Sequence, residues 1–174
     1  LGYAADESLK PVDLFGDGIS DLTKSKVKPF IDAMDDLDEA TKTLDWGNAI
    51  VTEADVANIG SKLEAITKTI LDELDSDRNE ALGKLDPLKA AFGEERFAEL
   101  TARVDQSYTK QTEQIGLWES EINTILGTAQ AERRTLTEEE AARIEEIQAQ
   151  MKETGIKYLS ESETESNLIL QRLK

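Results

Sequence analysis

The residues whose types and spacing best suit chemistry are Asp75, Asp77 and Asn79, which alternate with other side chains along a short stretch. Oxygen ligands at the first, third and fifth positions are typical of the calcium-binding loop of an EF-hand. Two positions depart from that pattern, because Glu80 replaces the glycine of the sharp turn and Asp86 replaces the long bidentate glutamate. The same stretch also fits an uninterrupted helix with its carboxylates in solvent. The sequence leaves weak calcium binding open and favours the solvated helix face.

Other acidic residues offer less specific chemistry. Asp13, Asp17 and Asp21 are spaced by four, which is not the alternating pattern of a calcium loop, and we interpret them as part of a flexible acidic leader. Paired carboxylates can also support acid–base hydrolysis. Because the chain has 37 acidic residues, finding such a pair indicates nothing. We therefore predict no catalytic, cofactor-binding or metal-ligating residues.

The composition excludes several classes of activity. The chain has neither cysteine nor histidine, so disulfides, thiolate metal sites and Ser–His or Cys–His nucleophile pairs are impossible. A net charge of −17 repels nucleic acid. No GxxxxGK(S/T) phosphate loop occurs, and no apolar run approaches the ~20 residues of a membrane-spanning helix. The sequence predicts a protein that is not an enzyme, uses no cofactor, and has neither a nucleic-acid-binding nor a membrane segment.

Helix-start signals dominate the rest of the sequence. Thr137 and Glu140 have the spacing of a capping box, in which each side chain bonds the backbone amide of the other residue. The same spacing recurs from Thr52 and from Ser160. Apolar residues are 39 % of the chain and aromatic residues only 5 %, which suits narrow seams between helices. The predicted fold class is all-α, an elongated antiparallel helical hairpin or coiled-coil bundle of about five helices.

We divide the chain into three parts: a loosely ordered leader (1–25), an antiparallel helical hairpin with a third packed helix (26–134), and two capped C-terminal helices (135–174). Pro29 fits the first turn of the first helix, and Gly155 can close the fourth helix, which is expected to end at about residue 153. Gly116 and Gly127 either weaken the long third helix or mark the close approach of another helix.

Apolar residues at steps of three and four predict the seams along which these helices pack. The seam residues are Phe30, Met34, Leu37, Val56, Ile59, Leu63, Ile66, Ile70, Leu100, Val104, Ile115, Trp118, Ile122 and Ile125. Phe97, Tyr108 and Trp118 share the helical spacing of the long third helix, and we interpret them as seam residues in preference to a recognition surface.

Several segments after about residue 25 carry a resemblance to a known family. They are Val27-Lys28-Pro29-Phe30-Ile31-Asp32, Thr69-Ile70-Leu71-Asp72, Asp77-Arg78-Asn79-Glu80-Ala81-Leu82, Pro87-Leu88-Lys89, Tyr108, and the closest part, Leu136-Thr137-Glu138-Glu139-Glu140 through Ile144, Ile147 and Met151 to Leu159-Ser160-Glu161-Ser162-Glu163. In their order these segments resemble an internal helical region of the tail tape-measure proteins of long-tailed bacteriophages and prophages of Gram-positive bacteria. None of them is a catalytic signature.

The resemblance implies a structural role in tail-length determination and tail assembly inside the tail tube. It implies partners that are other copies of the chain, in a homo-oligomer, and phage tail proteins. The expected location is the virion tail, or the host cytoplasm during assembly. The alternative is an independent helical protein-binding or scaffold module, which predicts a monomer with an exposed apolar groove. A hydrolase with buried carboxylates would require a cleft, which an elongated bundle seldom provides.

Overall fold

The structure is a computed structural model that describes residues 15–174, a range that contains helices and no strand. Five helices are long: α2 (Asp21–Lys42), α3 (Glu53–Leu85), α5 (Glu94–Ala131), α6 (Glu138–Leu159) and α7 (Glu163–Leu173). A short 3₁₀ helix, η1 (Asp86–Leu88), and the single turn α4 (Lys89–Phe92) join α3 to α5. The all-α fold class predicted from the sequence is confirmed.

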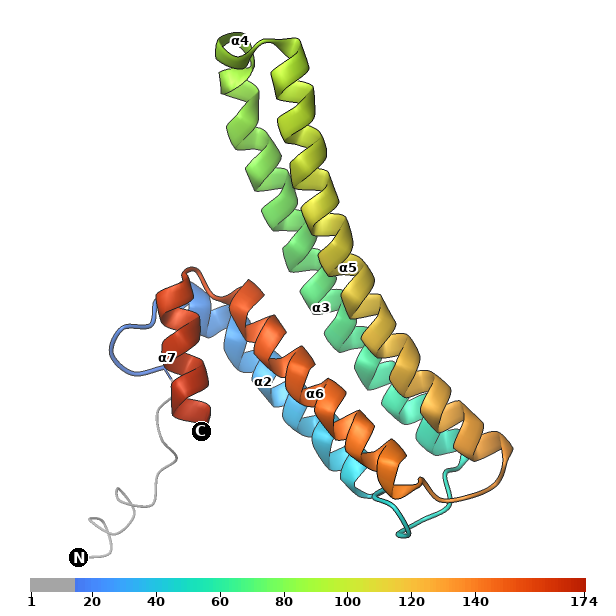
Figure 1. Ribbon diagram of the computed structural model, residues 1–174. Helices are drawn as coiled ribbons and strands as arrows, with labels where there is room; N and C mark the ends of the chain where they lie inside the picture. Colours follow the sequence, from blue (N-terminus) through green and yellow to red (C-terminus); the bar gives the residue numbers. More distant parts are fainter. Residues whose placement is uncertain (1–14) are drawn as a thin grey trace, which may run out of the picture.

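The two longest helices form a hairpin that protrudes from the rest of the molecule. α3 and α5 run antiparallel, and α2 and α6 lie side by side against one half of them (Figure 1). We call the other half of the hairpin, residues 75–114, the arm. α7 packs on α6 and crosses the end of the α2–α6 pair that is farthest from the connecting loops (Figure 1).

One apolar core joins the five long helices where α2 and α6 cover the hairpin. Apolar residues recur at steps of three and four along each helix, so their side chains share the face that turns inward. The buried apolar side chains of these helices are Val27, Phe30, Ile31, Met34 and Leu37 in α2; Ile59, Leu63, Ile66, Ile70 and Leu74 in α3; Ile115, Ile122, Leu126 and Ala129 in α5; Ile144, Ile147, Met151, Ile156 and Leu159 in α6; and Ile169 in α7.

Most of the predicted seam is buried. The structure buries Phe30, Met34, Leu37, Ile59, Leu63, Ile66, Ile70, Ile115 and Ile122. Val56, Leu100, Val104, Trp118 and Ile125 are only half-buried. In the last turns of α5 the fully buried positions belong to Leu126 and Ala129, so the seam lies to one side of the predicted stripe.

The first helix starts earlier than the sequence analysis predicts. The Ser20 hydroxyl accepts a hydrogen bond from the Thr23 backbone N–H at 3.2 Å and caps α2, so residues 21–25 are helical and not part of a loose leader. Pro29 consequently lies inside α2 and not in its first turn. Residues 1–14 of the predicted leader, including Asp13, lie outside the described residues, whereas residues 15–20 precede α2 without regular helix.

The predicted end of the fourth helix is wrong. α6 continues to Leu159, and Gly155 lies buried within it. A Cβ atom at Gly155 would stand 2.1 Å from Cζ of Phe30, so the glycine provides a notch for the Phe30 ring and not a helix stop. Gly116 and Gly127 of α5 show no such approach, because an added Cβ there would meet nothing within 4 Å.

The start of the last helix also differs from the prediction. Ser162, not Ser160, caps α7 by accepting a hydrogen bond from the Glu165 N–H at 3.2 Å. Ser160 instead ends α6, and its hydroxyl donates to the Ile156 carbonyl at 2.7 Å. The capping boxes predicted at Thr52 and Thr137 are both present.

The connection from α5 to α6 is fixed by its own backbone. Arg133 has a positive φ of 53°, and the N–H groups of Arg133 and Arg134 donate to the carbonyls of Gln130 and Ala129, each at 3.1 Å. This is a Schellman motif with arginine at the position that usually carries glycine. The Arg134 carbonyl also accepts a hydrogen bond from the Val51 N–H at 3.0 Å, which ties this connection to the loop between α2 and α3.

Candidate functional site

The stretch with calcium-loop spacing lies within the helix. Asp75, Asp77 and Asn79 belong to uninterrupted α3, as the helical interpretation predicts. Between them, Arg78 Nε donates to Asp105 Oδ1 at 2.7 Å and links α3 to α5. Burial, and then the neighbouring charge of Glu73, raises the pKa of Asp77. Among residues 15–174 no group of three or more acidic side chains is arranged to hold a metal ion.

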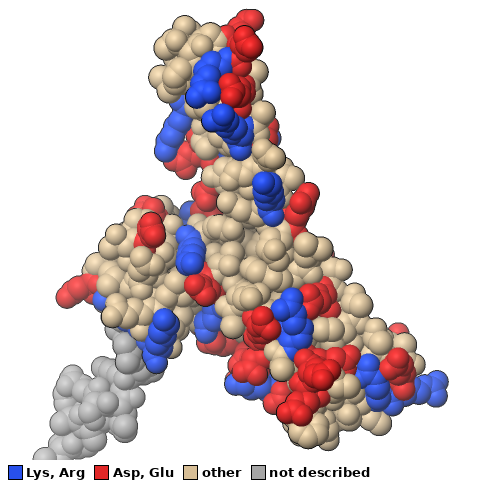
Figure 2. All heavy atoms as spheres, viewed as in Figure 1, with Lys and Arg blue, Asp and Glu red and all other residues tan. Residues whose placement is uncertain are grey.

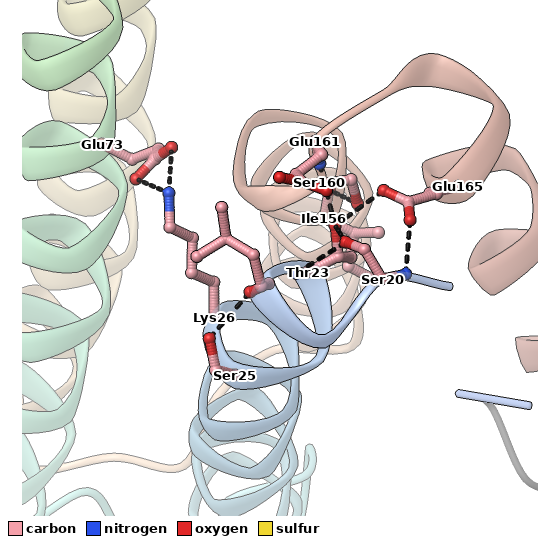
Figure 3. Close-up of polar contacts among 10 residues, drawn as sticks. Ser20, Thr23, Ser25, Lys26, Glu73, Ile156, Ser160, Glu161 and Glu165 are labelled. Carbon is pink, nitrogen blue, oxygen red and sulfur yellow. Dashed lines mark hydrogen bonds and ion pairs between the residues drawn. The ribbon is translucent and has the colours of Figure 1, made fainter. Parts of the chain in front are cut away.

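A buried polar joint connects the start of α2 with the start of α7 (Figure 3). The Glu165 carboxylate accepts hydrogen bonds from the Ser20 backbone N–H at 2.5 Å and from the Thr23 hydroxyl at 2.8 Å. The Thr23 hydroxyl oxygen in turn accepts the Glu161 backbone N–H at 2.9 Å. The Thr23 hydroxyl and then the Ser20 amide lower the pKa of Glu165, which favours its ionised form. One carboxylate thereby stabilises the N-terminal ends of two helices.

A second buried polar contact joins α2 to α6. Gln148 Nε2 donates to Thr41 Oγ1 at 2.9 Å, and the two residues are only 5 % and 8 % exposed. Buried polar groups cost free energy when they lack partners; the Gln148 amide nitrogen and the Thr41 hydroxyl supply each other, whereas Gln148 Oε1 has no protein partner. Like Glu165, they hold helices together.

Ion pairs fix the N-terminal part of α6, away from the polar joint. The Arg134 guanidinium bonds Glu140 through two nitrogens, at 2.6 and 3.1 Å. Arg134 is the main cause that lowers the pKa of Glu140, to about 2. Arg143 Nη2 donates to Glu121 Oε1 at 2.9 Å, links α6 to α5 and lowers the pKa of Glu121. The Glu140 side chain therefore serves both the capping box and the loop that precedes it.

An open cleft of about 710 Å³ separates the root of the arm from the body formed by α2, α6 and α7. Lys26 of α2 reaches across to α3, where its Nζ lies 3.0 Å and 3.2 Å from the two carboxylate oxygens of Glu73 (Figure 3). Lys157 and the carboxylates of Asp77 and Glu80 also line the cleft. With Glu73, Glu161 and Glu163, five carboxylates and two lysines line the cleft, so it is net acidic.

The arm differs from the rest of the hairpin in its burial. None of residues 75–114, all of which the structure describes, has a buried side chain. Phe97 and Tyr108, which the sequence analysis assigns to the seam, are half-buried there. At the tip, Leu88 and Phe92 are 43 % and 41 % exposed. No further helix covers the arm, so the seam between its two helices stays partly exposed to solvent (Figure 1).

A groove of about 480 Å³ opens at the root of the arm, between α3 and α5. Leu71, Leu74 and Tyr108 are its apolar lining. No residue lines both this groove and the larger cleft, so the two open on different sides of the hairpin. The sequence analysis did not find the groove, since it depends on where α2 and α6 stop covering the hairpin.

Charge is distributed unevenly over the face drawn in Figure 2. Acidic side chains gather at the end opposite the arm, whereas basic and acidic side chains mix at the arm's tip. Within residues 75–114 the sequence has nine acidic and six basic residues. The arm therefore offers charges of both signs.

Comparison of the chain with protein-family models, curated proteins and solved structures finds no match. Among the described helices, none combines the length and the apolar character needed to span a bilayer. The fold and the contacts define a class only: an all-α protein in which four of the six buried polar side chains of the described residues join helices.

Proposed function

We propose that this chain is a structural, non-catalytic segment of a phage tail tape-measure protein that contributes to tail-length determination and tail assembly. The observation that carries the proposal is that buried polar side chains bond one helix to another. Glu165, Thr23, Gln148 and Thr41 each bond another helix or the end of one. Together with the apolar core, these contacts give a fixed shape to an elongated helical unit, and the sequence resemblance supplies the context.

The geometry supports a ruler-like role because helix length per residue is nearly constant. The 38 residues of α5 span about 57 Å at ~1.5 Å per residue. The same 174 residues in one continuous helix would span about 260 Å. Folded as a hairpin, the segment therefore contributes much less length than its residue count. In this proposal its partners are other copies and tail proteins, in the virion tail or in the host cytoplasm during assembly.

Tail length in the phage or prophage that carries the gene tests the proposal. We expect in-frame deletion of codons 15–174 to shorten complete tails by about 60 Å if the segment keeps this fold, and by up to about 240 Å if it extends into one helix. Deletion of codons 75–114 alone should give a smaller loss. Leu117→Asp, at a side chain that is 63 % exposed, changes no residue count and is the matched control. Complete tails of unchanged length in the deletion strains would overturn the proposal.

The groove at the arm's root favours the second candidate, an independent helical protein-binding or scaffold module. The groove is open to solvent beside α3, and Leu71 and Tyr108 of its lining are only half-buried, as a recognition groove requires. The gene's neighbours separate the two candidates. Tail-tube and tail-completion genes beside it favour the tape-measure role, whereas their absence together with a chain that is not found in tails favours the binding module.

A further inference from the structure

The arm presents an incomplete four-helix bundle. Where α2 and α6 cover the hairpin, side chains such as Ile70 and Ile122 are fully buried. In the arm the same two helices continue without cover, and Leu100 and Val104 remain half-buried. Four packed helices enclose an apolar core more completely than two. The arm therefore has apolar side chains that two further helices could cover.

We infer that the arm is a self-association surface, on which the arm of a second copy of this chain packs antiparallel to complete a four-helix bundle. The inference deepens the homo-oligomer of the proposed function and rests on it to that extent. Such a pair of arms has two-fold symmetry, so the contact between the tip of one copy and the root of the other occurs twice, once at each end of the pair.

The two ends of the arm are complementary in shape. The tip carries the exposed apolar side chains of Leu88 and Phe92, and the root carries the open groove lined by Leu71, Leu74 and Tyr108. Between them, residues 94–114 of α5 span about 30 Å. An antiparallel partner of the same length therefore brings each tip to the other copy's groove.

The charges of the two ends bear on the orientation of the pairing. Asp72, Asp75 and Glu113 line the groove, together with Arg78. The tip carries the cations Lys84, Lys89 and Arg96, and Lys89 Nζ lies 5.5 Å from the centre of the Phe97 ring, close to the apolar residues of the tip. The tip is balanced in charge, because it also carries Asp86, Glu94 and Glu95. The antiparallel pairing therefore avoids the repulsion that a parallel pairing would create between two acidic grooves.

The area of the arm is sufficient for such a contact. A face about 30 Å long and two helices wide, about 20 Å, gives about 600 Å² per copy and about 1,200 Å² in total. This value is at the lower end of specific interfaces, so the complex should be weak and in equilibrium with the monomer.

The mass of the chain in solution tests the inference. Sedimentation velocity from about 1 µM to about 500 µM should show the 19.3 kDa monomer converting to a dimer of twice that mass. Phe92→Asp, at an exposed tip residue, should weaken dimerisation at least about tenfold, since it places a carboxylate in the acidic groove. Trp46→Asp is the matched control, because Trp46 is 57 % exposed and lies outside the arm. Unchanged helicity by circular dichroism shows that each variant folds.

Cross-linking tests the orientation directly, because the chain has no cysteine. Ala90→Cys at the tip and Thr109→Cys at the groove are made in two separate chains, which are then mixed. A short bismaleimide should join tip to groove and give few tip-to-tip products.

Three results would overturn the inference: a monomer throughout the concentration range, a dimer weakened by Trp46→Asp and not by Phe92→Asp, or predominant tip-to-tip products. A monomeric chain leaves the tail-length test standing. Unchanged tails overturn the proposed function whatever the mass in solution.

Discussion

The contact between Gly155 and Phe30 makes an unusually sharp prediction for Gly155→Ala. In an exposed helix, glycine to alanine stabilises by about 1 kcal/mol because alanine restricts the unfolded chain. At Gly155 the added Cβ would stand 2.1, 2.5 and 2.8 Å from three atoms of the Phe30 ring, where carbon atoms in contact are normally about 3.5–4.0 Å apart. The ring is only 2 % exposed, so it cannot turn into solvent.

The magnitude follows from these two opposing effects. Overpacking a dense core costs about 1–3 kcal/mol, and three contacts below 3.0 Å place this site at the upper end. After subtraction of the helix gain, we expect Gly155→Ala to destabilise by about 2 kcal/mol and to lower the Tm by about 4–8 °C. Gly116→Ala is the matched control, since it makes the same change inside α5 with nothing within 4 Å of the new Cβ. It should stabilise by up to about 1 kcal/mol.

Urea denaturation followed by far-UV circular dichroism measures both free energies of unfolding. A double-mutant cycle with Phe30→Leu then tests the contact itself, because the smaller side chain lacks the ring atoms that Cβ would meet. The double variant should be more stable than the sum of the single effects by at least about 1 kcal/mol. If Gly155→Ala proves as stable as Gly116→Ala, or if the cycle shows no coupling, the reasoning is refuted.

Three further predictions concern the core, a helix end and the response to acid. Leu63→Asp buries an unpaired charge at a fully buried position and should cost about 4 kcal/mol or more of unfolding free energy. Leu117→Asp, at an exposed position, should cost under about 1 kcal/mol. Full helicity and an unchanged Tm for Leu63→Asp would argue against the seam. Arg133→Gly should raise the free energy of unfolding by about 0.5–1 kcal/mol, because glycine adopts the φ of 53° without strain; a lower stability would contradict this account of the helix end. Arg134 lowers the folded-state pKa of Glu140 to about 2, so the stability from this pair is complete above about pH 4.5 and lost as the pH falls from there towards 2. Glu140→Gln should cost about 1 kcal/mol at pH 7 and flatten the loss of stability in acid, as acid titration of both proteins would show.

Much of the fold could be predicted because its causes are local. A capping box needs residues only three positions apart, and both Thr52 and Thr137 begin helices as their neighbours predict. Steps of three and four place apolar residues on one side of a helix whatever that side meets, so the positions of Leu63 and Ile122 in the core could be inferred. The lack of histidine and cysteine likewise excluded whole classes of chemistry without any structure.

The wrong predictions share one physical cause: neighbouring residues allow more than one helix boundary, and contacts with distant residues select one of them. Ser160 and Ser162 each precede a glutamate by three residues, so both have the spacing of a helix start. The structure selects Ser162, because the carboxylate of Glu165 bonds the start of α2, more than a hundred residues earlier in the chain. Ser20 and Thr23 make this contact with Glu165 at the start of α2, which begins at Asp21 and not near Pro29.

Composition and periodicity by themselves determined that this chain is helical, acidic and built along apolar seams. Only the tertiary structure decided which of its glycines is a notch for an aromatic ring, and which part of the long hairpin is covered. Local rules fix how a segment folds, since their interactions span a few residues. Whether a segment is covered depends on which helices pack against it, and α2 and α6 end before they reach the arm.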